Sequence, residues 1–408
     1  MLLNVTCPGC GLLCDDILLE TEPHVKLVNN TCAKAVAFFE QPAAKLNAMI
    51  KGKPASMDDA IAQAAKLLKS AKNPLFSGLS TDVAGFRAIY QLAQKTNGTL
   101  KHMNANSMQR NLDVLQSTGW QTTTLTEVKN RADVIVCIGT DIVSHNARFF
   151  ERFVWTKNAL FTDANAREII YVGEDFTSKN MACEAGISPL NRHPSLLACS
   201  QADLPEITAV LHALILGKKL HAEFVAGIKV ADLQAVANKL KQAKYAVLTW
   251  IAKDLDYEHA ELTIQQITEI IATLNQTTRA AGLMLGGSDG DTSANNANTW
   301  LSGLSLNNLV ALHDCVVWIN SFNPNNVPPE TDKPHIVIGS SNMKHQADVF
   351  IPVATPGLDC SGTLFRVDSA VVLPLKKVRE NTLLSLGEVV QKIEAALVNG
   401  NLVNDKPE

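Results

Sequence analysis

Short runs of β-branched and apolar residues alternate with amphipathic stretches along most of the chain. Runs such as VIVCI at 134–138 and VVWIN at 316–320 are continuous, without a polar residue at every second position. This pattern is typical of parallel strands that are buried on both faces. The stretches between them, such as MDDAIAQAAKLLKS at 57–70, repeat their apolar residues with a helical period. The alternation predicts α/β domains built on parallel sheets.

Small and polar residues follow several of the predicted strands. Ligands of open α/β sheets bind outside the carboxyl ends of the strands, so these positions form a candidate pocket rim. The positions are Gly139, Thr140, Asp141, Gly173, Glu174, Asp175, Ser321, Asn323, Gly339 and Ser340.

A glycine- and asparagine-rich segment, GLMLGGSDGDTSANNANTWLSG at 282–303, interrupts the alternation. It has two interpretations. It is either an unstructured linker or a loop that approaches a ligand or a partner.

Length and charge narrow the class of protein. The 408 residues are too many for one ordinary hydrophobic core, so two or three domains are expected. A formal net charge of -4 with no dense basic run argues against nucleic-acid binding. The sequence has neither an export signal nor a long uncharged apolar run, so we expect a cytoplasmic protein with no membrane span.

Four cysteines near the start have the spacing of metal ligands. Cys7, Cys10, Cys14 and Cys32 give C-x2-C-x3-C-x17-C, a set that suits a [4Fe–4S] cluster or a tetrahedral zinc ion. Three cysteines within eight residues and a distant fourth favour the cluster, while zinc and unmetallated thiols stay open. Cys360, in a glycine-rich stretch, is a further candidate for an exposed thiol.

Three stretches together resemble one family. CPGCGLLCDDI with NNTCAKA, TLTEVKNRADVIVCIGTD, and ADVFIPVATPGLDCSGTLFRVD are similar to the B subunit of formylmethanofuran dehydrogenase, a molybdopterin oxidoreductase of the formate dehydrogenase type. The resemblance implies a [4Fe–4S] module and two Rossmann-like parallel-sheet domains around a tungsten or molybdenum bis-pterin cofactor. Eight of the strand-end positions named above would then line a vestigial pterin cleft: Gly139, Asp141, Gly173, Asp175, Ser321, Asn323, Gly339 and Ser340.

The resemblance also implies a division of the chain. Residues 1–50 would form the cysteine-rich module, and 51–118 with 310–380 a discontinuous Rossmann-like domain. Residues 119–309 would form the second such domain, and 381–408 a helical tail.

The chain departs from the family at the metal-ligand position. The family's cysteine or selenocysteine, with the histidine, glycine and proline that follow, aligns with Ser107, Met108, Gln109 and Arg110. A neutral hydroxyl is a far poorer ligand than a thiolate, and a serine near a helix start is often only a polar cap residue. We therefore assign no catalytic residue and do not expect a bound bis-pterin.

With this departure, the chain resembles the B subunit of the formyltransferase/hydrolase complexes of methylotrophs. Such complexes move a formyl group from tetrahydromethanopterin to a methanofuran-like carrier and hydrolyse it to formate. The resemblance implies a non-redox scaffold bound to the A hydrolase, the C subunit and the D formyltransferase. The alternative is an active tungsten or molybdenum subunit with Ser107 as an unusual ligand, which the intact cysteine quartet favours. A purely structural cluster is compatible with the scaffold hypothesis.

Three further residues have two interpretations each. His145 is either a contact for a pterin phosphate or a surface or cap histidine. Arg366 and Asp368 form either an interdomain or cofactor contact or an ordinary surface ion pair.

Overall fold

The computed structural model describes the chain except residues 29–31, 43–46, 175–183, 307–311 and 403–408. The chain forms two compact units. Unit 1 comprises Met1–Ala105 and Gly287–Glu408, and unit 2 comprises Asn106–Gly286. The predicted changes between domains, at 118/119 and 309/310, differ from these bounds. The difference arises because the loop at 287–291 and the helix after it pack within unit 1.

Unit 1 is built on a seven-stranded sheet in the order β5-β4-β17-β16-β15-β6-β7. Its strands are β4 (Met49–Ile50), β5 (Lys53–Pro54), β6 (Pro74–Ser80), β7 (Thr99–His102), β15 (Cys315–Asn320), β16 (His335–Ser340) and β17 (Val349–Val353). The strands from β17 to β7 are parallel, and β4 joins β17 in the antiparallel sense. Every residue of β6, β15, β16 and β17 is buried, which confirms the prediction from their continuous apolar runs.

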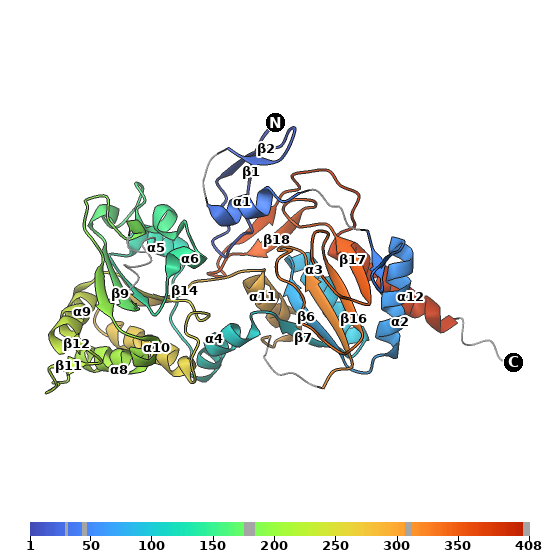
Figure 1. Cartoon of the computed structure of the whole chain (residues 1–408). Helices are drawn as coiled ribbons and strands as arrows, with labels where there is room; N and C mark the ends of the chain where they lie inside the picture. The colour runs from blue at the N-terminus through green and yellow to red at the C-terminus, as the bar shows by residue number, and fades with distance from the viewer. Residues whose placement is uncertain (29–31, 43–46, 175–183, 307–311, 403–408) are drawn as a thin grey trace. The chain divides into compact units, whose positions relative to one another are not determined.

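Helices and two small sheets complete unit 1 (Figure 1). The helices are α1 (Ala33–Phe39), α2 (Met57–Ser70), α3 (Val83–Lys95), α11 (Asp291–Ser302) and α12 (Leu386–Leu402). Helix α12 packs against α2 and α3, so the predicted C-terminal tail is part of this unit. The first sheet holds β1 (Leu2–Val5), β2 (Ile17–Glu20) and β3 (Lys26–Leu27), and the second pairs β18 (Gly362–Phe365) with β19 (Val372–Leu375).

Unit 2 is built on a parallel five-stranded sheet in the order β10-β9-β8-β13-β14. Its strands are β8 (Val134–Ile138), β9 (Glu168–Gly173), β10 (Ser195–Ala198), β13 (Ala246–Trp250) and β14 (Ala280–Met284), with a separate pair β11 (Phe224–Val225) and β12 (Ile228–Lys229). The α-helices are α4 (Ala105–Ser117, in this unit from Asn106), α5 (Leu125–Arg131), α6 (Ile142–His145), α8 (Leu204–Ile215), α9 (Val230–Gln242) and α10 (Ala260–Leu274). Short 3-10 or π turns span Phe150–Val154, Ala164–Ala166 and Gln201–Asp203.

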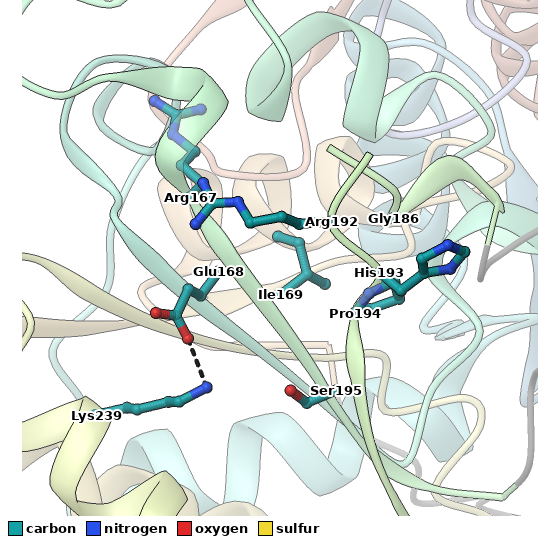
Figure 2. Close-up of a pocket in the computed structure, with 9 residues that line it drawn as sticks. All are labelled: Arg167, Glu168, Ile169, Gly186, Arg192, His193, Pro194, Ser195 and Lys239. Atoms are coloured by element: carbon teal, nitrogen blue, oxygen red, sulfur yellow. Dashed lines mark ion pairs between the residues drawn. The ribbon is translucent and has the colours of Figure 1, made fainter. Parts of the chain in front are cut away.

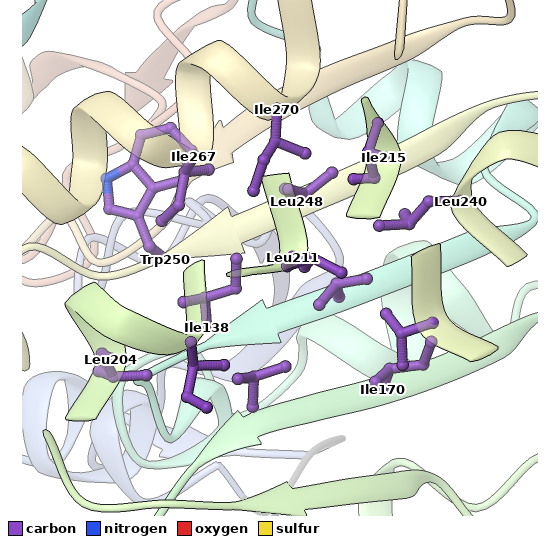
Figure 3. Close-up of a cluster of buried hydrophobic side chains, with 14 of the residues drawn as sticks. Ile138, Ile170, Leu204, Leu211, Ile215, Leu240, Leu248, Trp250, Ile267 and Ile270 are labelled. Carbon is purple, nitrogen blue, oxygen red and sulfur yellow. The ribbon is translucent and has the colours of Figure 1, made fainter. Parts of the chain in front are cut away.

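One apolar cluster holds the helices of unit 2 on its sheet. Alternate residues of the strands, among them Ile138, Ile170, Leu248 and Trp250, face side chains from α8, α9 and α10 (Figure 3). Trp250 is fully buried in this cluster, and its indole N–H donates to Asn111 Oδ1 at 2.9 Å. Burial of the large ring with its polar atom satisfied stabilises this layer without leaving an unpaired donor.

Both sheets are doubly wound, which places a topological switch point in each. In unit 1 the chain leaves β6 toward β7 on one side, and later strands add on the other side beside β15. In unit 2 the same reversal occurs between β8 and β13. The carboxyl ends of these strand pairs are where a ligand of such a sheet binds. The segment at 282–303 comprises the end of β14, the loop at 287–290 and helix α11, so its interpretation as an unstructured linker is wrong, although the boundary between the two units lies within it.

An aspartate clamp recurs at the opposite end of both sheets. Asp314, directly before β15, accepts the backbone N–H groups of Lys72 and Asn73 at 2.7 and 3.0 Å. Asp133, directly before β8, accepts those of Lys244 and Tyr245 at the same two distances. Each carboxylate pairs backbone donors that precede the neighbouring strand and lack a ladder partner there.

The clamp makes unit 1 sensitive to acid. The two N–H bonds from Lys72 and Asn73 lower the pKa of Asp314 below its ordinary value. A carboxyl with a lowered folded-state pKa stabilises the fold above its unfolded pKa, and this effect is lost as the pH falls through the folded value. We expect Asp314→Asn to lower the melting temperature at pH 7, and the difference from the native chain to shrink below about pH 4. Thermal unfolding across the acid range measures this, and a difference that grows toward low pH would contradict it.

Candidate functional site

The turn between β1 and β2 brings three cysteines together. Cys7 follows β1 and Cys14 precedes β2, and the Cys7 N–H donates to the Cys14 carbonyl at 2.9 Å. Between them the Leu13 N–H donates to the Cys10 carbonyl at 3.2 Å. Cys32 is the N-cap residue of α1. Cys7 and Cys14 are buried, and Cys10 and Cys32 are half-buried.

The four thiols interact electrostatically. Burial raises the pKa of Cys7 well above its usual value, and Cys10, Cys14 and Cys32 raise it further. The Gly9 N–H opposes this by donating to Cys7 Sγ at 3.4 Å. A Cβ at Gly9 would lie 3.0 Å from the Lys34 carbonyl oxygen and 3.3 Å from Cys7 Sγ, so the turn fits glycine closely. A bound cation would relieve the repulsion among the thiolates.

The four thiols are chemically suited to bind a metal, but their positions do not form a metal site. Thiolates are the ligands of iron–sulfur clusters and of structural zinc. Within the residues that the structure describes, however, no three His, Cys, Asp or Glu side chains are placed as the ligands of one metal ion. The thiols converge without forming a closed ligand shell, and their metal role stays a prediction.

The cysteine turn is fixed to two other segments of unit 1. The Gly11 N–H donates to the Gly287 carbonyl at 2.5 Å, and the Val367 N–H donates to the Gly11 carbonyl at 2.9 Å. Cys10 and Gly11 also line a small pocket together with the loop at 287–293 and with Leu364 of β18. The cysteine module is therefore held by the same loop that approaches the switch point of unit 1.

That switch point is occupied by the chain itself. A Cβ at Gly290 would lie 2.5 Å from the Thr81 carbonyl oxygen, just after β6, and 3.5 Å from the Phe322 ring, just after β15. Asp82 caps α3 through Gly85 N–H at 3.0 Å and also accepts the N–H of Thr363 in β18 at 3.3 Å. Burial raises the pKa of Asp82. Backbone from the 287–291 loop and from β18 thus packs against the residues that would border a ligand.

Buried polar contacts hold the loop in place. His102, at the end of β7, is fully buried, and its Nε2 lies 3.3 Å from the Asp289 carbonyl oxygen. Asn104 donates to Ser288 Oγ at 3.1 Å and to Asp291 Oδ2 at 3.2 Å. Burial lowers the pKa of His102, so the imidazole is neutral near pH 7. Beyond the polar composition of GGSDGD, no pattern in the sequence indicates these contacts.

The switch point of unit 2 holds a cluster around Asp254. Its carboxylate accepts the Thr140 hydroxyl at 2.6 Å and lies 2.7 Å from His145 Nε2, and its backbone carbonyl accepts the Gln201 amide at 2.7 Å. His145 is therefore paired with a half-buried carboxylate. The sequence indicates no such partner for it. Asp141 caps α6 through the Val143 and Ser144 N–H groups, at 3.1 and 3.3 Å.

The other predicted cleft residues lie within or beside strands. Gly173 accepts the Cys199 N–H at 2.8 Å, and Gly339 ends its strand ladder against Asn320. Ser321 and Ser340 are buried, and the Ser321 hydroxyl has no hydrogen-bond partner in the described structure. The Asn323 N–H donates to Asn320 Oδ1 at 3.2 Å. Asp175 lies outside the described residues. The cofactor role of this set stays a prediction.

The ion pair of Arg366 and Asp368 is buried. Their side chains are 11% and 0% exposed, and Arg366 Nη2 lies 2.6 Å from Asp368 Oδ2. The interpretation as an ordinary surface pair is therefore wrong.

Among the described helices none is both long and apolar enough to cross a membrane.

The chain is similar in sequence to B subunits of two kinds of enzyme complex. No family model matches it. It is 24% identical over 414 residues to the B subunit of tungsten-containing formylmethanofuran dehydrogenase 2 of Methanococcus maripaludis, across 92% of this chain and 93% of the relative. The protein of that name from Methanocaldococcus jannaschii is 23% identical over the same shares. The B subunit of the formyltransferase/hydrolase complex Fhc of Methylorubrum extorquens is 37% identical over 92 residues, which are 22% of this chain and 25% of that one.

The chain is homologous to these B subunits. The resemblance found in the sequence is thereby confirmed. In structure the chain matches a chain of the formyltransferase/hydrolase complex FhcABCD from Methylorubrum extorquens, solved with methylofuran, at a TM-score of 0.69 and 22% identity over 87% of this chain and 99% of that one. Acetylene hydratase from Pelobacter acetylenicus matches at a TM-score of 0.63 and 10% identity over 97% of this chain and 69% of that one. The predicted α/β fold with parallel sheets is confirmed, and the chain shares it with these two structures.

The resemblance would place the dehydrogenase family's metal-ligand segment at 107–110, and these residues lie at the start of a regular helix. Ser107 lies half-buried in the first turn of α4. Arg110, at the proline position, donates from Nη1 to the Ala252 carbonyl at 2.8 Å and forms an ion pair with Asp256. Its side chain, 17% exposed, ties α4 to the loop after β13. Arg110 therefore stabilises the packing of α4 against this loop within unit 2.

Two glycines test whether the loop at the unit 1 switch point is close-packed. Gly290 and Gly303 both have φ of 75°, but a Cβ at Gly303 would meet nothing within 4 Å. We expect Gly303→Ala to cost about 1 kcal/mol from its left-handed backbone alone. Gly290→Ala should cost a further 1–3 kcal/mol, roughly, because its methyl group would overlap the Thr81 carbonyl. Denaturant unfolding of both variants measures the difference, and equal losses would mean that the loop is loosely placed.

Proposed function

We propose that this chain is a non-redox scaffold subunit of a formyltransferase/hydrolase complex. The complex would act in one-carbon metabolism linked to tetrahydromethanopterin and methanofuran, and it would release the formyl group as formate. The observation that carries the proposal is Arg110, a charged side chain bound to the 252–256 loop at the family's proline position.

The substitutions at 107–110 act against a tungsten or molybdenum centre in two ways. The first is chemical, because a serine hydroxyl must lose a proton before it can bind the metal as a thiolate does. The second is steric and electrostatic. The family's Gly-Pro pair is replaced by a helical turn whose arginine already has two partners, Ala252 and Asp256.

The packing of unit 1 supports the same proposal. The Gly290 loop and β18 lie against Thr81 and Asp82, where a doubly wound sheet would hold part of a cofactor. The proposal therefore interprets the cleft as filled by the protein itself. It assigns no catalytic residue to this chain.

The proposed partners are the A hydrolase, the C subunit and the D formyltransferase of such a complex. The names of the relatives support this, since one is the B subunit of an Fhc complex and one matched structure is FhcABCD. Transfer and hydrolysis would then take place on the other chains. We place the assembly in the cytoplasm, where thiols stay reduced and available to metals.

The cysteine quartet would act as a metal staple. We propose a [4Fe–4S] cluster, with zinc as the alternative, bound by Cys7, Cys10, Cys14 and Cys32. Metal binding at thiols that are gathered only in the folded state stabilises that state. Gly11, between the second and third ligands, would pass this stabilisation to the 287 loop through its two backbone bonds.

The alternative is an active tungsten or molybdenum subunit of formylmethanofuran dehydrogenase. Two observations favour it: the cysteine quartet is complete, and relatives aligned over 92% of this chain are named as tungsten-containing. In that case Ser107 would bind the metal and be essential for turnover.

Ser107→Ala separates the two functions. The scaffold proposal expects rates of formyl transfer and hydrolysis by the purified complex to stay within about two-fold of the native rates, because Ser107 touches no reacting atom. Loss of activity by 100-fold or more, roughly, with the complex still assembled would favour the metal-ligand role. Size-exclusion chromatography of both complexes provides the assembly control.

Cys7→Ser tests the staple. We expect the variant to lose its bound iron and sulfide, or zinc, and to melt at a lower temperature than the native chain. Cys360→Ser is the matched control, because this half-buried thiol lies outside the quartet and burial raises its pKa to about 12. Equal metal content in all three proteins, purified without oxygen, would show that the quartet is not the binding site.

A further inference from the structure

Unit 2 has a second candidate site at the other end of its sheet. A cavity of about 370 Å³ lies where β9 and β10 begin, on the side away from the switch point. Its polar lining comprises Arg167, Glu168, Arg192, His193, Ser195 and Lys239, from the two strand starts, the segment before β10 and helix α9 (Figure 2). The volume is within the usual range for a pocket that holds a small molecule.

The cavity carries a surplus of positive charge. Three cationic side chains line it, and Glu168 is the one carboxylate among its described lining residues. Glu168 pairs with Lys239 at 2.7 Å, and each of these side chains is 41% exposed. Such an exposed pair is weak and can rearrange at little cost. Arg167 and Arg192 have no carboxylate of their own in the lining, in a chain whose formal net charge is -4.

Arg167 is a buried cation whose hydrogen bonds go to neutral groups. The residue is 2% exposed, and its guanidinium donates to the carbonyls of Phe153 at 2.9 Å, Val154, and Lys129 at 2.5 Å. Its Nε has no partner in the described structure. Burial lowers the pKa of Arg167 to about 10, with Asp133 and Asp163 partly opposing the shift, so the group stays charged at neutral pH. A buried charge bonded to neutral carbonyls gains from an anion nearby.

Arg192 is the side chain best placed to meet an anion. Its Nη2 donates to the Asn165 carbonyl at 2.8 Å, and the other guanidinium N–H groups can turn to a ligand. Figure 2 shows the Arg192 side chain beside Arg167, Ser195 at the start of its strand, and Lys239 reaching from helix α9 toward Glu168. Guanidinium and ammonium groups bind phosphate and carboxylate oxygens through charge-assisted hydrogen bonds.

We propose that this pocket binds a small oxyanion, the phosphate or carboxylate group of a small molecule. Arg192 and Lys239 bind its oxygens, the Ser195 hydroxyl donates to it, and the field of Arg167 favours its charge. Glu168 weakens binding, because it competes for Lys239 and repels the anion. This role is independent of the metal sites and of the proposed scaffold function.

Calorimetric titration of the full chain tests the site. Inorganic phosphate and malonate are titrated separately at constant ionic strength, with chloride as the reference salt. We expect saturable binding with one site per chain, a Kd at least ten-fold weaker in Arg192→Ala, and a tighter Kd in Glu168→Gln. Saturation by one anion and not the other identifies the oxyanion class and supports the proposal.

The control is Lys253→Ala, an exposed lysine in the loop after β13, at the carboxyl end of the strands, whereas the pocket lies where β9 and β10 begin. The Kd of the Lys253→Ala variant for either anion should equal that of the native chain. Absence of saturable binding by both anions would overturn the proposal. An equal loss in Lys253→Ala and Arg192→Ala would also overturn it, because general charge attraction would then explain the binding. Lys239→Ala, with circular dichroism to check folding, gives a second loss variant.

Discussion

The hydrogen bond from the Gly11 N–H to the Gly287 carbonyl joins the two features on which unit 1 depends. On one side of it is the cysteine turn between β1 and β2. On the other is the loop that lies between the carboxyl ends of β6 and β15. Withdrawal of the loop from the switch point would break this hydrogen bond, and so would a movement of the cysteine turn. A metal at the cysteines would therefore stabilise a closed switch point some distance along the chain.

Under the proposed function, this coupling would explain why the chain has a complete cysteine quartet but a serine at position 107. An electron-transfer cluster needs a redox centre beside it, but a structural cluster needs only a fold to stabilise. The substitutions at 107–110 place a regular helix and a bound arginine in unit 2. The quartet belongs to unit 1, where Gly11, between its second and third cysteines, is hydrogen-bonded to Gly287 and Val367 of the same unit. Residues 107–110 can therefore change without altering the cysteine quartet.

The strands could be predicted well from the sequence, and the long-range contacts could not. Runs such as VIVCI are buried on both faces, and this property is visible in the residues themselves. The Asp133 and Asp314 clamps, the burial of His102 and the partners of Asp254 join residues far apart in the chain, and no local pattern encodes them. The segment at 282–303 was ambiguous for the same reason, since its glycines and asparagines suit both a linker and a close-packed loop. Four thiols at ligand spacing predict a metal site from the residues alone, and that metal role stays a prediction.

Elemental analysis of the native complex shows whether this chain holds a redox metal. The complex is purified without oxygen, and iron, sulfide, zinc, tungsten and molybdenum are quantified per copy of this chain. For a non-redox scaffold we expect iron with sulfide, or zinc, and neither tungsten nor molybdenum. Tungsten or molybdenum in stoichiometric amount would contradict it.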